Sequence, residues 1–74
     1  MELPIRILEK HKGKMVNVRI KSGSDFRGRL RLTDTMMNMT LEDAQELSTG
    51  DKPGRRLGKV LIRGNNVLLI KLEI

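Results

Sequence analysis

Apolar and polar residues alternate with a period of two over most of residues 16–32, and this alternation constrains the fold more than any other feature. Val16, Val18 and Ile20 are separated by polar residues, the pattern of a strand with one buried face. Over 26–32 one face carries Phe26, Gly28, Leu30 and Leu32, and the other carries Arg27, Arg29 and Arg31. Two antiparallel strands joined by a turn at 22–24 are therefore expected.

Helix-terminating and turn-forming residues divide the rest of the chain. Leu3, Ile7 and Leu8 share one helical face and Gly13 follows them, which predicts a helix over 3–12. A third strand is expected from Met37 to Leu47, a loop over 48–56, and two further strands over 57–63 and 66–74. We predict a single domain over 1–74 that is mostly β: a short N-terminal α-helix and a bent antiparallel sheet or partly open barrel.

The last two predicted strands are apolar on nearly every residue, so they need cover on both faces. They contain Val60, Leu61 and Ile62, and then the run Val67–Ile70. A chain of 74 residues has a thin core of its own. The chain has no cysteine and one histidine, His11, so disulfides are excluded and a zinc site would be unusual. A subunit interface is therefore the expected source of the cover.

An excess of basic residues favours a polyanionic partner. Lys and Arg number 15 against nine acids, a formal net charge of +6. This balance favours nucleic acid first and an acidic membrane surface second. Because the chain has no Trp or Tyr, binding on a platform of stacked aromatic rings is excluded. No apolar run approaches the ~20 residues of a membrane span, and the N-terminus lacks a signal-peptide pattern, so we expect an intracellular, cytoplasmic protein.

Residues that often carry catalysis do not form a convincing set. His11 lies among lysines, and Glu42 and Asp43 are adjacent in a strand, which predicts side chains on opposite faces. The glycine spacing over 23–28 resembles a phosphate loop but lacks the Lys and Ser/Thr that should follow. We expect no enzyme activity, no cofactor and no metal. The arginine face of 27–31 has two interpretations, a solvated outer surface or a stripe that faces phosphates.

Two short polar segments give the most specific functional signal. Asp34–Asn38 ends one strand and begins the next, and Ile62–Val67 does the same later in the chain. Each places polar side chains on a tight turn, where functional residues are common. Together they provide an amide that can read a base edge and a guanidinium that can stack on a base or grip a phosphate. Asn and Gly are also ordinary turn residues.

With these segments the chain resembles the Sm and Sm-like (LSm) proteins from Leu3 to Glu73, and most of all the archaeal Sm-like proteins. The first family motif falls in 14–47 and the second in 57–74. The matching residues are Val16, Val18, Gly23, Phe26, Gly28, Leu30, Asp34, Met37, Asn38, Leu41, Asp43 and Ala44, and then Ile62 to Val67. The resemblance implies the Sm fold, a helix over a strongly bent five-stranded sheet. It also implies a homo-oligomeric ring, usually of seven subunits, closed by pairing the fourth strand of one subunit with the fifth of the next.

The resemblance further implies binding of uridine-rich single-stranded RNA at the inner pore rim, by a scaffold or chaperone in RNA processing or decay. On this chain Asn38 would bond the uracil edge and Arg63 would stack on the base. Met36 stands where the family often has His or an aromatic ring, so weaker or less uracil-selective stacking is expected. Asp34, Gly64 and Asn65 would hold the loops. Secondary RNA contacts would come from the basic helix region, which contains Arg6, Lys10, Lys12 and Lys14.

Two other functions stay open at this point. One is a small basic β-barrel that binds duplex DNA without sequence preference, which charge and size permit. The other is a mainly structural ring with little RNA affinity of its own inside a larger ribonucleoprotein. Other RNA-processing proteins would then be partners. The sequence leaves rings of six, seven or eight subunits open.

Overall fold

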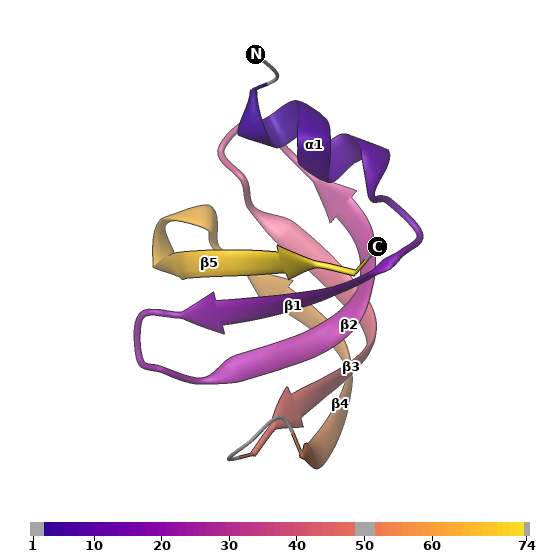
Figure 1. Ribbon diagram of the computed structural model, residues 1–74, viewed down its shortest axis with the longest axis vertical. Coiled ribbons are helices and arrows are strands. Elements are labelled where there is room, and N and C mark those ends of the chain that lie inside the picture. Colours follow the sequence, from indigo (N-terminus) through magenta and orange to yellow (C-terminus); the bar gives the residue numbers. More distant parts are fainter. Residues whose placement is uncertain (1–2, 49–51, 74) are drawn as a thin grey trace.

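One short helix precedes five antiparallel strands in the computed structural model, which describes residues 3–48 and 52–73 (Figure 1). The elements are α1 (Pro4–Lys10), β1 (Met15–Ile20), β2 (Asp25–Thr33), β3 (Met39–Leu47), β4 (Pro53–Ile62) and β5 (Val67–Leu72), with a 3₁₀ turn at Gly64–Asn66. The strands form one sheet in the order β4-β3-β2-β1-β5. The sheet is bent, and α1 lies across one end of it. The predicted mostly-β architecture is confirmed.

Several predicted boundaries were wrong by a few residues. The loop expected over 48–56 is shorter, because β4 already begins at Pro53, opposite Leu47 of β3. Composition suggested a loop, but β4 is an edge strand, where a proline is tolerated because its missing N–H faces no partner. The third strand starts at Met39 and not at Met37, whose φ of 62° is incompatible with a strand. The loop predicted over 48–56 also includes residues 49–51, which lie outside the described part of the chain.

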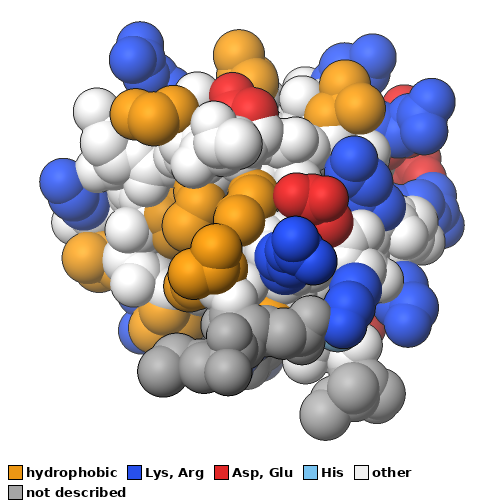
Figure 2. Space-filling view, turned by 90° about the horizontal axis from the view of Figure 1, so that it is seen from above, with side chains coloured by type: hydrophobic (Ala, Val, Ile, Leu, Met, Phe, Trp, Pro, Cys, Tyr) orange, Lys and Arg blue, Asp and Glu red, His pale blue; other side chains and the backbone are white. Residues whose placement is uncertain are grey.

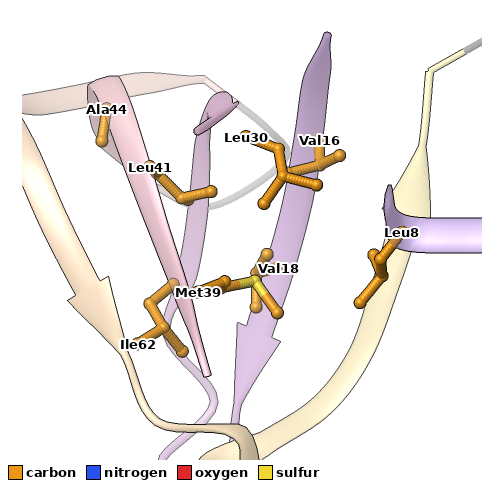
Figure 3. Packing of buried hydrophobic residues seen from close by; sticks show 8 residues of the cluster. All are labelled: Leu8, Val16, Val18, Leu30, Met39, Leu41, Ala44 and Ile62. Carbon is orange, nitrogen blue, oxygen red and sulfur yellow. The ribbon is translucent and has the colours of Figure 1, made fainter. Parts of the chain in front are cut away.

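The core lies inside the bend of the sheet, where β1, β2, β3, β4 and α1 contribute side chains that point toward one another (Figure 3). Its buried members are Leu8, Val16, Val18, Leu30, Met39, Leu41, Ala44 and Ile62. Leu8 is the one residue by which α1 enters this cluster. A helix of seven residues is too short to persist alone, so this packing holds it in place.

Irregular strand pairing moves two side chains, those of Leu32 and Asp43, away from the faces that simple alternation predicted. The β2–β3 register shifts between Leu30 and Leu32, and Leu32 is 58% exposed instead of buried. On β3, Asp43 has a φ of 51° within a second shift. As a result Glu42 pairs with Arg31 and Asp43 pairs with Arg29. Both carboxylates therefore reach the same arginine face, because a bulge resets the alternation.

Both edges of the sheet are open and apolar. β4 and β5 each pair on one side only, and their exposed residues include Leu61 at 73%, Leu68 at 58% and Leu69 at 42%. Unpaired edges with apolar side chains favour pairing with another strand. This exposure agrees with the prediction that apolar residues of these two strands are buried against another subunit.

Candidate functional site

The loop between β2 and β3 is organised around the carboxylate of Asp34. Its Oδ1 accepts hydrogen bonds from the backbone N–H of Met36 at 2.9 Å and of Asn38 at 3.1 Å. Its Oδ2 accepts one from the Asn38 side-chain amide at 3.1 Å. This amide, together with the two N–H groups, holds the pKa of Asp34 below its usual range. Asp34 therefore stays ionised, and its hydrogen bonds hold the loop in a tight turn.

The two polar segments of the sequence meet through one hydrogen bond. The backbone N–H of Gly64, in the turn between β4 and β5, donates to Asn38 Oδ1 at 2.8 Å. The backbones approach so closely that a Cβ at Gly64 would lie 2.0 Å from the Met36 carbonyl oxygen. Only glycine fits this approach without moving a loop. The sequence named both segments, and the structure shows why the second needs its glycine.

These bonds fix the Asn38 side chain in one orientation. One amide hydrogen points to Asp34 and the oxygen accepts from Gly64. A primary amide offers two hydrogens and two lone pairs, so one donor and one acceptor position remain for a ligand. An adjacent donor and acceptor are the pair that reads the edge of a base.

Arg63 lies beside this amide, at the edge of an open hollow of ≈ 290 Å³ lined by Asp34, Asn38, Leu61 and Arg63. Within the described residues, the Arg63 side chain is exposed and takes part in no ion pair. Its guanidinium is available for a base or a phosphate. Leu61 was missed by the sequence reasoning, since it looked like an ordinary strand residue.

Met36 and Asn65 occupy the outer positions of the two loops. The Met36 side chain is 74% exposed, although it does not line the hollow beside Arg63. By contrast Met39 is 1% exposed in the core, and Met37 packs against that core. Asn65 is also exposed. The structure thus brings together Asp34, Asn38, Gly64 and Arg63, with Met36 and Asn65 around them.

The arginine face of β2 is bound to carboxylates of the chain itself. Arg27 pairs with Glu73 at 2.7 Å, Arg29 with Asp43, and Arg31 with Glu42 at 3.5 Å. On the neighbouring strand Arg19 pairs with Asp25 at 2.7 Å. We call this surface the outer arginine face. Because its charge is balanced locally, this face fits the solvated-surface interpretation better than the phosphate-stripe interpretation.

The basic helix region lies at the same end of the molecule as the site loops. A hollow of ≈ 320 Å³ is lined by Pro4, Ile7 and Leu8 of α1 together with Met37, Gly64 and residues of β5. Seen from this end, hydrophobic side chains gather near the centre and Lys and Arg lie around them (Figure 2). The four predicted secondary residues are exposed; Arg6 and Lys10 lie on α1, and Lys12 and Lys14 follow it in the chain.

Other kinds of site find little support in residues 3–48 and 52–73. No group of three or more His, Cys, Asp or Glu side chains in this part of the chain is placed to hold a metal ion. Both ring nitrogens of His11 are buried without a hydrogen-bond partner. None of the helices described is long and apolar enough to cross a membrane.

Comparison with known proteins gives consistent matches. The family model of the LSM domain matches residues 6–72. An snRNP Sm-like protein of Thermococcus sibiricus is 41% identical over 93% of this chain and 90% of its own. The structure of a Pyrococcus abyssi Sm protein in complex with a uridine heptamer superposes with a TM-score of 0.88, at 39% identity over 97% of this chain and 100% of that one. The P. aerophilum SmAP1 heptamer superposes with a TM-score of 0.88, at 32% identity over 100% and 97%.

Proposed function

The chain belongs to the LSM domain family, and from this premise we propose that it forms a ring that binds uridine-rich single-stranded RNA. A relative of 39% identity is a Sm protein in complex with a uridine heptamer. The observation that carries the proposal is the Asn38 amide, held by Asp34 and Gly64 with one donor and one acceptor left over. The protein then serves as an intracellular scaffold or chaperone in RNA processing.

In this proposal each site residue has a separate task. Asn38 presents its free N–H and lone pair to the uracil edge, and Arg63 stacks its guanidinium on one face of the base. Met36 contacts the other face with a thioether, which packs on a ring but lacks the π-surface of an aromatic side chain. Asp34 and Gly64 act through Asn38 by fixing its orientation. Asn65 lies on the same turn, where it can donate to the ribose or phosphate.

The basic helix region supplies a secondary contact. Its residues Arg6, Lys10, Lys12 and Lys14 are exposed at the end of the molecule that carries the site loops. They face the side from which an RNA strand would approach. Contacts of this kind go to phosphates and carry no sequence information.

The ring is proposed from the two open edges of the sheet. Pairing β4 of one subunit with β5 of the next satisfies both edges and removes them from solvent. Leu61 of β4 lies in a cross-strand row with Leu32 and Thr40, on the side of the sheet where Leu32 is exposed. Leu69 of β5 lies opposite Arg19 of the outer arginine face. Pairing places Leu61 near Leu69 of the next copy. The P. aerophilum relative is a heptamer, and we propose the same number here.

A test of the ring uses Leu61→Lys. The side chain is 73% exposed in the single chain, so the variant folds, but a charge at the interface opposes assembly. Light scattering is expected to give a ring for the wild type and a smaller species for the variant. An intact ring in the variant would contradict this pairing of strands.

We propose binding and not catalysis as the role of the chain. Glu42 and Asp43, the best carboxylate pair in the sequence, are both bound to arginines of the outer arginine face. Neither carboxylate is therefore free to act as a general acid or base. Binding of duplex DNA is the competing class, and the RNA experiment includes it as a control.

The experiment is fluorescence anisotropy with labelled U, A and C oligonucleotides and a DNA duplex, each at two salt concentrations. Selective binding of U that survives higher salt is expected, since base contacts release no counterions. Arg63→Ala should weaken U binding by about 1–3 kcal/mol. Arg31→Ala is the matched control, because it removes the same charge from the outer arginine face. If Arg63→Ala binds oligouridine with wild-type affinity at equal ring assembly, the assignment of Arg63 to the site is refuted. If all four ligands bind equally and lose their affinity at the higher salt concentration, the proposed function is refuted.

A further inference from the structure

Four basic residues lie at the β3–β4 hairpin, and among the residues that the structure describes only one of them has a carboxylate partner. We call Lys52, Arg55, Arg56 and Lys59 the basic hairpin; all four are exposed. Within the described part of the chain the ion pair here joins Arg55 to Glu46 at 4.0 Å, with the arginine side chain 77% exposed. A pair so long and so exposed contributes little. The hairpin therefore carries a net positive field.

The described strands on the two sides of this turn are in close contact. The Ser48 backbone N–H and Oγ both donate to the carbonyl oxygen of Lys52, at 2.9 and 3.2 Å. A Cβ at Gly54 would lie 2.3 Å from the Glu46 carbonyl oxygen, so the two strands are in close contact at this point. The basic side chains thus project from two strands that are hydrogen-bonded to each other at this point.

The basic hairpin lies at the end of the long axis opposite α1 (Figure 1), in a molecule that extends 34 Å along that axis. The site loops adjoin α1, as the shared hollow shows. Between the two ends lies the outer arginine face, whose charges are paired. The excess positive charge is therefore divided between two separate ends, and a ring repeats this arrangement in every subunit.

We propose that the basic hairpin binds the phosphodiester backbone of single-stranded RNA that extends beyond the base site. This inference rests on the proposed function, which brings such a strand to the ring. The ligand is the backbone, because residues 45–59 contain no aromatic side chain on which a base could stack. Arg and Lys contacts of this kind hold phosphates and are blind to sequence. RNA bound at one end of the subunit is then held at the other as well.

The test compares a short and a long ligand on a matched pair of variants. Arg56→Gln/Lys59→Gln removes two charges from the basic hairpin, and Lys21→Gln/Lys71→Gln removes two exposed charges elsewhere. Neither variant touches the site. Affinity is measured by anisotropy for a uridine heptamer and for an oligouridine of about twenty nucleotides, at about 50 and 200 mM salt. Light scattering checks that all proteins form the same assembly.

In the wild type the long oligouridine is expected to bind more tightly than the heptamer. The hairpin variant should lose about ten-fold in affinity for the long ligand, with a shallower salt slope, because each lost phosphate contact removes about 0.7 from that slope for single strands. Its affinity for the heptamer, and both affinities of the control variant, should stay near wild type.

Three results overturn the inference. The first is equal affinity of the wild type for both lengths, and the second is an equal loss in the control variant. The third is unchanged binding of the long ligand by the hairpin variant, as expected if the basic hairpin serves an acidic protein segment instead. Failure of the wild type to bind the heptamer at all refutes the proposed function itself, so the two failures are distinguishable.

Discussion

Replacement of Asn38 by alanine should destabilise the protein by about 1–3 kcal/mol. The change removes the hydrogen bond to Asp34, which is exposed and contributes little to stability. It also leaves the Gly64 N–H, half-buried against Asn38 Oδ1 at 2.8 Å, without its partner. An unsatisfied donor of this kind costs about 1–3 kcal/mol. The lost hydrogen bond is the one that joins the two site loops, so RNA affinity should decrease as well.

The measurement is urea unfolding at one fixed protein concentration, because assembly makes stability depend on concentration. Asn65→Ala is the matched control: the same side chain is removed from the neighbouring turn, where it is exposed, and a change within about 0.5 kcal/mol is expected. Faster hydrogen exchange at the Gly64 amide should accompany the loss in the Asn38 variant. Equal stability of Asn38→Ala and Asn65→Ala would refute the reasoning.

Asn38→Asp separates the two hydrogen bonds of this side chain. An acceptor for Gly64 is kept, but a carboxylate now stands where the amide donated to Asp34 at 3.1 Å. Two carboxylates at this distance raise the pKa of one of them. The folded state of the variant therefore holds the proton more tightly than the unfolded chain, and its deficit against wild type should shrink as the pH falls from 7 toward about 4. A deficit independent of pH would contradict the contact.

Three further outcomes are expected. Gly64→Ala should lower stability by about 1–3 kcal/mol in urea unfolding, since its Cβ would lie 2.0 Å from the Met36 carbonyl oxygen; wild-type stability would refute the close contact of the loops. Met36→Tyr should bind oligouridine about three- to ten-fold more tightly in anisotropy, because an aromatic ring stacks better than a thioether; no gain would mean that this side chain does not face the base. The pKa values of Asp25 and Glu73 are lowered by hydrogen bonds from Arg19 and Arg27, so their contribution to stability is present above about pH 4 and is lost as the pH falls through the lowered values. Urea midpoints measured from pH 6 down to about 3 should fall more steeply in wild type than in Glu73→Gln, and equal slopes would contradict the pairing.

Period-two alternation predicted the strands well where their pairing is regular and failed at bulges. Val16, Val18 and Leu30 are buried as expected. Leu32 and Asp43 are not where alternation puts them, because the register shifts on either side of β3. A bulge depends on how two strands pair, and the local sequence of these strands gave no signal for it.

The candidate site shows the same division. Residue types and turn positions were enough to select the two polar segments, but Asn and Gly are also ordinary turn residues. The roles expected of Asp34, Asn38, Arg63 and Gly64 therefore came from the family resemblance. The role of Leu61 as part of the lining was not predictable. Neither was the pairing of each arginine of the outer arginine face with a carboxylate from another strand.

The sequence by itself determined the strand content, the positive charge, the need for cover on the last two strands and the identity of the two polar loops. These are local properties, set by composition, periodicity and turn chemistry. Only the tertiary structure decided that Asn38 accepts from Gly64, 26 residues away. It also decided that, among the described residues, the arginines of the outer arginine face are paired with carboxylates while the basic hairpin has one long ion pair. Hydrogen bonds and ion pairs act over a few ångströms, so they depend on which distant residues the folded sheet brings together.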